Sequence, residues 1–351
     1  MTFSVMRLNS LRLVKHFSTM LENVINDISF SGSYRPKLLV TCSDVPASYI
    51  ETLRRKCEVT VCHGTNRSEI LKALPGAEGI LWLTADKLNE EVLDLAGPQL
   101  KVISTMTSGM DYVDATPFRE RGIALGHTPK VVNNPVADIA IGLMIAAARR
   151  FHEGRNQILE SSCVQRPQWM LGQDVTGSTV GIVGFGGIGQ TIAKRLQAFE
   201  VERIIYTGHK RKPEAEHFGA QFVSFIELLE ASDFVFIACP LTNETSNMFD
   251  AEAFGKMKAT CVLINVARGG IVDQQALVQA LKSGTIFAAG LDVMTPEPLP
   301  ADDQILSLPN CIIVPHLGTA TRKSLEDMFC ITAKNVLSVL AGNPLVAPFV
   351  K

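Results

Sequence analysis

The chain has 351 residues, of which 46% are hydrophobic and 19% are charged, and its formal net charge at pH 7 is -2. This length suits two globular domains with well-buried cores, and the near-neutral charge argues against a nucleic-acid-binding surface. The longest apolar run, residues 139–148, is much shorter than the roughly 18 residues of a membrane span. We therefore expect neither nucleic acid nor a membrane as a partner.

The eight cysteines are scattered along the chain and form no C-x-x-C pair. Several stand inside apolar runs, as Cys261 does before residues 262–264. This spacing favours reduced cysteines in a buried core over a disulfide framework, and we expect no bound metal.

Residues 1–36 differ in composition from the rest of the chain. Arg7, Arg12 and Lys15 stand among apolar residues, and no acidic residue precedes Glu22. This pattern is typical of a mitochondrial leader, and a dispensable N-terminal extension is the alternative interpretation. In either case we expect residues 1–36 to lie outside the fold. The expected compartment is the cytosol, with the mitochondrial matrix as the alternative that a leader would bring.

From Lys37 onward, short apolar strands alternate with helical patterns, which predicts a parallel sheet with helices on both faces. The turn after the first strand, residues 41–45, contains no glycine, so this first domain is not expected to hold a nucleotide. The expected strands cover residues 38–40, 59–61, 79–83, 101–104 and 123–125, and the expected helices cover residues 46–56, 68–74 and 89–96.

A second α/β domain follows. A long apolar helix, Pro135–Arg150, is opened by Asn133 and Asn134, and a loop-rich stretch over residues 154–176 leads to the second sheet. The final helix, over about residues 322–340, is long enough to run back to the first domain. The expected strands cover residues 180–183, 203–207, 222–223, 234–238, 262–266, 286–291 and 312–314.

The first strand of this second domain leads into the most informative motif of the chain. Residues 184–189 read Gly-Phe-Gly-Gly-Ile-Gly, and a helical pattern follows them. A strand, G-x-G-x-x-G and a helix in this order predict a dinucleotide site. Gly184 permits the tight turn, Gly186 lets a pyrophosphate approach the backbone, and Gly189 lets helix and strand pack closely. The free amides at the start of the helix favour the phosphate charge.

The end of the second strand bears on the choice of cofactor. In NAD enzymes this strand usually ends in Asp or Glu, which accepts hydrogen bonds from the ribose 2′-hydroxyl. Here Thr207 is followed by Gly208, His209, Lys210, Arg211 and Lys212, and the next acid is Glu214. A solvated basic loop is the alternative interpretation. Because no acid stands here to repel a 2′-phosphate, and because the basic run attracts one, we expect NADPH, with NADH as the weaker alternative.

Three later strands of the second domain end in polar residues that suit catalysis. Arg268 follows the strand at 262–266, Glu297 follows the strand at 286–291, and His316 follows the strand at 312–314. Each alone has an ordinary structural explanation. Because open parallel sheets bind ligands at the carboxyl ends of their strands, we expect the three side chains to share one site with the dinucleotide.

Four motifs in this order resemble the signature set of the D-isomer-specific 2-hydroxyacid dehydrogenases, and are most similar to the glyoxylate reductase/hydroxypyruvate reductase branch. They are residues 184–189, 265–270 (Asn-Val-Ala-Arg-Gly-Gly), 290–293 (Gly-Leu-Asp-Val) with Glu297-Pro298, and 315–318 (Pro-His-Leu-Gly). The similarity runs from Lys37 to the C-terminus.

The resemblance implies two doubly wound parallel-sheet domains. A Rossmann dinucleotide-binding domain, residues 135–317, would be inserted in a flavodoxin-like substrate domain, residues 37–134 with 318–351. It also implies reduction of glyoxylate and hydroxypyruvate to glycolate and D-glycerate. A homodimer is expected.

The resemblance further implies roles for individual residues. Arg268 would bind the substrate carboxylate and polarise the keto oxygen, His316 would donate a proton, and Glu297 would orient the imidazole. Substrate would also meet Ser108 and Gly109. Asp292 would hold the nicotinamide carboxamide. The complete expected set of cofactor-binding residues is Gly184, Gly186, Gly187, Ile188, Gly189, Gly208, His209, Lys210, Arg211, Pro240, Val266, Asp292 and Gly318.

Two points stay open. Ser108 stands where an apolar residue is common in this branch, which leaves the substrate side chain undetermined. Trp169 either reaches a neighbouring subunit's substrate site or anchors the packing of the dimer arm. The alternative functions are a nucleotide-sensing binding protein of the co-repressor type on the same fold, and a dehydrogenase for another 2-hydroxy acid.

Overall fold

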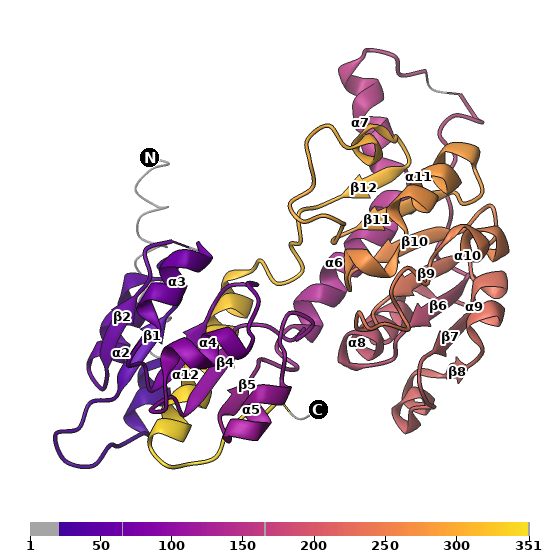
Figure 1. Cartoon of the computed structure of the whole chain (residues 1–351). Helices are drawn as coiled ribbons and strands as arrows, with labels where there is room; N and C mark the ends of the chain where they lie inside the picture. Colours follow the sequence, from indigo (N-terminus) through magenta and orange to yellow (C-terminus); the bar gives the residue numbers. More distant parts are fainter. Residues whose placement is uncertain (1–20, 65, 165, 350–351) are drawn as a thin grey trace, which may run out of the picture. The chain divides into compact units, whose positions relative to one another are not determined.

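The computed structural model describes residues 21–349, apart from residues 65 and 165. The described chain forms two compact units, which are distinguished by colour along the sequence in Figure 1. Unit 1 comprises the described residues up to Val131 and from Arg322, and unit 2 comprises Val132–Thr321. The expected bounds, 134/135 and 317/318, differ from these by a few residues.

Unit 1 contains five parallel strands in the order β2-β1-β3-β4-β5. This is the flavodoxin-like order of doubly wound sheets. The three residues that end β1 and all four residues of β3 and of β4 are buried, as expected where helices cover both faces of a sheet. The strands are β1 (Lys37–Val40), β2 (Glu58–Val61), β3 (Gly79–Trp82), β4 (Val102–Thr105) and β5 (Ala124–Gly126).

The C-terminal helix of the chain completes unit 1, as predicted from its length. Helix α12 (Arg322–Leu340) lies along the sheet, where Figure 1 shows it in yellow beside the indigo and violet strands. Its buried Phe329, Ala333 and Leu337 share a core with Leu38 and Leu81. The other helices are α2 (Ala47–Arg54), α3 (Arg67–Ala73), α4 (Glu90–Ala96) and α5 (Thr116–Arg121).

The expectation that residues 1–36 lie outside the fold is wrong for their described part. Residues 21–26 are helical. Leu21, Ile25 and Ile28 are buried in the same core as Leu38 and Leu53. Leu21 and Ile25 are four positions apart and fall on one face of this helix, and Ile28 follows two residues after the helix ends. The segment Met1–Met20, to which the leader prediction applies, lies outside the described residues.

Unit 2 contains seven parallel strands in the order β12-β11-β10-β9-β6-β7-β8. This is the Rossmann order with one strand added, so the predicted fold class is confirmed. The strands are β6 (Thr179–Val183), β7 (Arg203–Thr207), β8 (Ala220–Phe222), β9 (Phe234–Ile237), β10 (Val262–Asn265), β11 (Ala288–Leu291) and β12 (Cys311–Ile313).

Helices cover both faces of this sheet. The long apolar helix α6 begins two residues earlier than predicted, because Asn133 and Asn134 belong to its first turn. A Cβ on Gly290 of β11 would lie 2.9 Å from Leu143 of α6, so helix and strand approach closely there. The helices are α6 (Asn133–Ala148), α8 (Gly187–Leu196), α9 (Phe225–Ala231), α10 (Ala251–Lys256) and α11 (Gln274–Ser283), with 3-10 turns η1 (Gln197–Phe199), η2 (Pro213–Phe218), η3 (Gly269–Ile271) and η4 (Gln304–Ser307).

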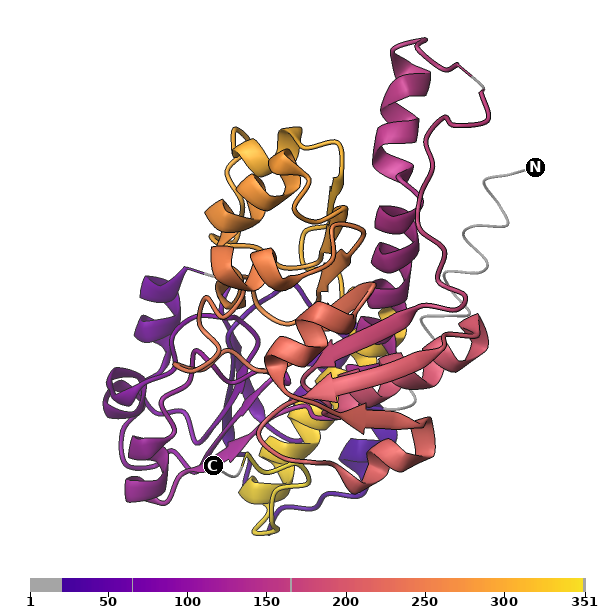
Figure 2. The same cartoon turned by 90° about the vertical axis from the view of Figure 1, so that its right-hand side faces the viewer.

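A further helix, α7 (Phe151–Leu159), occupies the start of the stretch that was expected to be loop-rich. Figure 2 shows α7 and the chain after it projecting beyond α6, away from the sheet of unit 2. None of its residues is buried, so the apolar periodicity that reveals a packed helix is missing. Among the described residues, no helix is both long and apolar enough to cross a membrane.

Candidate active site

The carboxyl ends of the strands of unit 2 gather the predicted catalytic and cofactor-binding residues at one edge of the sheet. Strand order reverses between β6 and β9, and such a switch point is where doubly wound sheets bind ligands. The turn after β6 contains the glycine motif, and β7 leads into residues 208–211. Pro240, Val266, Asp292 and Gly318 follow β9, β10, β11 and β12.

The glycine turn fits the pyrophosphate of a dinucleotide. Gly184 has a φ of +94°, and a Cβ there would lie 2.6 Å from the backbone of Cys239. A Cβ on Gly189 would lie 2.2 Å from the carbonyl oxygen of Gly184. By contrast, a Cβ on Gly186 would meet nothing within 4 Å, and no side chain caps α8 at this residue. The first N–H groups of α8 therefore have an open approach for an anion.

Arg268 is held by the residues at the end of β10. The Asn265 side chain donates from Nδ2 to the Arg268 carbonyl at 2.9 Å and accepts from the Ala267 N–H at 3.0 Å. The Arg268 guanidinium donates to the Ala267 carbonyl at 2.7 Å. Asn265 is 1% exposed, and it fixes the backbone that carries the arginine. Asn265 was not among the predicted site residues, although a polar residue at the end of an apolar strand is a pattern that indicates a functional or structural role.

His316 and Glu297 form the pair that the sequence predicted. His316 Nδ1 lies 2.9 Å from Glu297 Oε2, and the side chains are 46% and 35% exposed. The other carboxylate oxygen of Glu297 accepts a hydrogen bond from the Met294 N–H at 3.0 Å. Because Nδ1 is occupied by the carboxylate, Nε2 is the ring nitrogen left for a substrate.

The electrostatics of this pair favour a protonated imidazole. The hydrogen bond to Glu297 is the main cause that raises the pKa of His316 above its usual value, against the opposing effect of burial. Burial acts to raise the pKa of Glu297, but hydrogen bonds from His316 and from the Met294 N–H together hold it below its usual value. The charge of Arg268 also acts on both groups, lowering the two pKa values.

Asp292 fixes the turn that presents His316. It is 1% exposed, and its two carboxylate oxygens accept from the N–H groups of Leu317 at 2.6 Å and Gly318 at 3.0 Å. Its carbonyl accepts from the His316 N–H at 2.8 Å. His316 has a φ of 55°, a left-handed conformation that is uncommon outside glycine. These hydrogen bonds hold the strained residue in place. Burial raises the pKa of Asp292, although both N–H groups act in the opposite direction.

Ser108 and Gly109 belong to unit 1, shortly after β4. The Thr128 N–H donates to the Thr107 carbonyl at 2.9 Å. This bond joins the loop that contains Ser108 and Gly109 to the chain that follows β5. Burial lowers the pKa of the neighbouring His127, and a hydrogen bond with the Ser108 backbone partly offsets that effect. Trp169 belongs to unit 2 and donates from its indole N–H to Gln157 on α7 at 3.0 Å, a packing contact within one chain.

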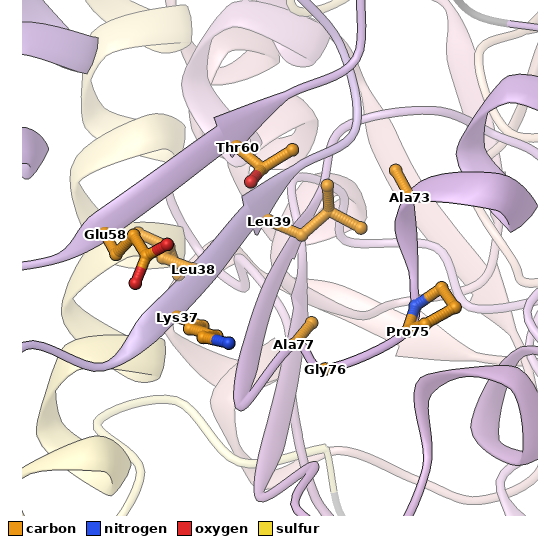
Figure 3. A pocket seen from close by; sticks show the side chains of 9 residues that line it. All are labelled: Lys37, Leu38, Leu39, Glu58, Thr60, Ala73, Pro75, Gly76 and Ala77. Carbon is orange, nitrogen blue, oxygen red and sulfur yellow. The ribbon is translucent and has the colours of Figure 1, made fainter.

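Unit 1 also contains a small hollow at the opposite edge of its sheet, where β1 and β2 begin (Figure 3). Its volume is about 50 Å³, and Figure 3 shows Lys37, Glu58 and Thr60 at its wall. It does not include the predicted substrate residues. Among the described residues, no group of three or more His, Cys, Asp or Glu side chains is placed to hold a metal ion.

A Rossmann sheet with an arginine and a histidine–carboxylate pair at its carboxyl edge defines an NAD(P)-dependent dehydrogenase. The sequence model of the "D-isomer specific 2-hydroxyacid dehydrogenase, NAD binding domain" matches residues 141–318. The chain belongs to the D-isomer specific 2-hydroxyacid dehydrogenases, a family of NAD(P)-dependent oxidoreductases that act on 2-hydroxy acids.

Similar proteins narrow the class further. The chain is 44% identical to a glyoxylate reductase/hydroxypyruvate reductase of Homo sapiens over 79% of its own length and 85% of the relative's. It is 39% identical to a glyoxylate reductase of Thermococcus kodakarensis, over 88% and 94%. An NADPH-dependent glyoxylate/hydroxypyruvate reductase of Sinorhizobium meliloti, solved with NADP and malonate, is 29% identical with a TM-score of 0.79, over 90% of this chain and 97% of that one.

Proposed function

We propose that this enzyme reduces glyoxylate and hydroxypyruvate to glycolate and D-glycerate, with NADPH as the preferred hydride donor. The single observation that carries the reaction type is the 2.9 Å contact between His316 and Glu297 at the edge of the sheet that also bears Arg268. The names of the relatives support the choice of substrate. When bound, the nicotinamide supplies the hydride.

Arg268 is proposed to bind and polarise the substrate. Its planar guanidinium matches a carboxylate, and its charge stabilises the negative charge that develops on the keto oxygen. Asn265 holds the backbone of Arg268 and so limits the directions that the guanidinium samples. Ser108 and Gly109 are proposed to donate backbone N–H groups to the substrate carboxylate.

His316 is proposed to supply the proton. As hydride adds to C2, the π electrons of the C2–O bond move to oxygen, and that oxygen takes the proton from Nε2 of the imidazolium. The product is the 2-hydroxy acid, and the neutral imidazole is reprotonated from solvent. Glu297 keeps Nδ1 protonated and the ring oriented, which presents Nε2 as the donor.

The preference for NADPH rests on the turn after β7. Strand β7 ends at Thr207, and no carboxylate stands where an NAD enzyme binds the ribose 2′-hydroxyl. The positions that follow supply His209, Lys210 and Arg211, which are all exposed. The remaining predicted cofactor contacts, at Pro240, Val266, Asp292 and Gly318, are proposed on their position at the same edge of the sheet.

A test of the substrate and cofactor together is a panel of 2-keto acids assayed with NADPH and with NADH. We expect turnover of glyoxylate and hydroxypyruvate, with a higher kcat/KM for NADPH than for NADH. Loss of nicotinamide absorbance provides the measurement. Turnover confined to other 2-keto acids would refute the substrate proposal, whereas an equal kcat/KM for the two cofactors would refute only the cofactor preference.

The hydrogen bond between His316 and Glu297 predicts a specific change in pH dependence. In Glu297→Gln the amide oxygen still accepts from the Met294 N–H, but the carboxylate oxygen that accepts from His316, and the negative charge that goes with it, are gone. The pKa of His316 therefore falls, and the protonated donor is lost at a lower pH. We expect the alkaline limb of kcat/KM for keto-acid reduction to move to lower pH than in the wild type. An alkaline limb that does not move would show that His316 is not the titrating acid.

We further infer that two copies of the chain pair through the projecting arm of unit 2. The arm exposes large apolar side chains that a second copy would cover: Phe151, Ile158, Leu159, Val164 and Leu171. Light scattering in solution is expected to give a mass of two chains. A mass close to the 38.2 kDa of one chain would contradict the pairing.

A further inference from the structure

We propose that Phe222 and Tyr206 are positioning residues for the cofactor's 2′-phosphate: they hold the basic turn after β7, and Arg211 in particular, ready to bind it. Neither residue was among the predicted site residues. The inference rests on the proposed preference for NADPH and names the residues that make the turn selective.

An aromatic cluster lies beside the turn. Tyr206 in β7 is 2% exposed, and its ring centroid is 4.3 Å from that of Phe185, which belongs to the glycine turn. On the other side, the Tyr206 ring is 5.3 Å from the ring of Phe222 in β8, with the rings at 62°. The cluster thus connects the pyrophosphate turn with the edge strand of the sheet.

Two contacts fix the basic turn to this cluster. The Lys212 N–H donates to the Tyr206 hydroxyl at 2.8 Å, so the end of the turn is tied to a buried side chain. The guanidinium carbon of Arg211 lies 5.7 Å from the centroid of the Phe222 ring, within the range of a cation–π contact. An aromatic ring attracts the cation without using its N–H donors, which lie in the plane of the guanidinium. These donors stay available to an anion.

Among the basic side chains of the turn, Arg211 is the one that contacts the aromatic cluster. It forms no ion pair with any residue in the described part of the chain, and the Glu216 carboxylate, which lines the same hollow, is not paired with it. His209 is close to a carboxylate: the Thr242 hydroxyl lowers the pKa of Glu244 most, and the charge of His209 lowers it further. A guanidinium also matches phosphate geometry better than an ammonium does.

The surroundings of the Phe222 ring show what removal of the ring would do. A hollow of about 430 Å³ lies beside the ring, and the wall of this hollow includes Tyr206, Arg211, Lys212 and Phe222. Without the Phe222 ring, the Arg211 side chain has this open space to move into. The guanidinium would then sample more directions, and ordering it on a phosphate would cost more conformational entropy.

The test compares two probes by calorimetry, adenosine 2′,5′-bisphosphate and adenosine 5′-monophosphate, which differ in the 2′-phosphate. We expect Phe222→Leu to weaken binding of the bisphosphate by about threefold to fivefold, the size of an exposed cation–π contact, and to leave the monophosphate unaffected. Phe222→Tyr, which keeps the ring, should retain the wild-type difference. Tyr206→Phe removes only the hydroxyl that anchors Lys212. It should also lower the affinity for the bisphosphate without changing the affinity for the monophosphate.

Two controls make the result decisive. Phe218 contacts Phe185 in the same cluster at 6.0 Å without a cation–π contact to Arg211, so Phe218→Leu should not alter the ratio of the two affinities. In an Arg211→Ala background, Phe222→Leu should have no further effect on the bisphosphate, because the two residues act as one unit.

Four results in the variants would overturn the inference. They are an unchanged affinity for the bisphosphate in Phe222→Leu, an equal loss of affinity for both probes in that variant, additive effects in the double variant, and no effect of Arg211→Ala on the affinity for the bisphosphate. If the wild type itself does not distinguish the two probes, the proposed NADPH preference fails along with the inference. If the wild type does distinguish the two probes but Phe222→Leu binds both as the wild type does, the inference fails and the proposed NADPH preference stands.

Discussion

Replacing His316 with alanine is expected to lower kcat for keto-acid reduction by about 10²-fold or more, because a positioned general acid contributes at least this much. The affinity for NADPH should change little, since the glycine turn and the turn after β7 are separate from this side chain. Stopped-flow turnover with saturating cofactor, together with a binding titration, measures both quantities.

The backbone at this position calls for a second variant. His316 has a φ of 55°, which alanine adopts poorly and asparagine tolerates. His316→Asn should therefore keep the turn and still lose the proton donor, with a loss of kcat similar to that of the alanine variant. A kcat within a few-fold of the wild type in His316→Asn would remove His316 from the proposed role.

Replacing Arg268 with alanine is expected to have the second large effect, a fall in kcat of about 10²- to 10³-fold together with a higher KM. The fall in kcat has the size measured when a donor to a developing oxyanion is removed. The rise in KM follows from the lost carboxylate contact. Steady-state kinetics over a range of keto-acid concentrations separates the two.

Arg268→Lys distinguishes charge from geometry. Lysine keeps the positive charge but lacks the planar pair of donors, so we expect activity between that of the wild type and that of Arg268→Ala. A binding titration with NADPH serves as the folding control for both variants. Full activity in Arg268→Ala would contradict the proposed role.

The fold and the core of the site could be predicted because both follow from local patterns. Apolar runs of four or five residues separated by amphipathic helices indicate parallel sheets. The glycine turn then identifies the dinucleotide end of the second sheet, and side chains that follow its strands must meet at one edge. For this reason Arg268, Glu297 and His316 could be grouped although up to 48 positions separate them in the chain (316 − 268 = 48).

The errors arose where the deciding contacts are long-range. The basic, apolar composition of the N-terminus does not indicate that Leu21, Ile25 and Ile28 belong to the same core as helix α12, which begins more than 290 residues further along the chain (322 − 28 = 294). Helix α7 has no buried residue, so its sequence lacks the apolar periodicity that would predict a helix. The left-handed backbone of His316 and its support by Asp292 depend on the turn geometry, which spacing alone does not determine.

The central claim, that hydride is delivered to C2 of a keto acid to give the D-2-hydroxy acid, is tested most directly with a deuterium label on the cofactor. Hydroxypyruvate is reduced with NADPH carrying deuterium at both C4 positions, and the product is analysed by NMR and by its chirality. We predict one deuterium at C2 of D-glycerate. Glycerate without deuterium at C2, or the L-isomer, would contradict the account.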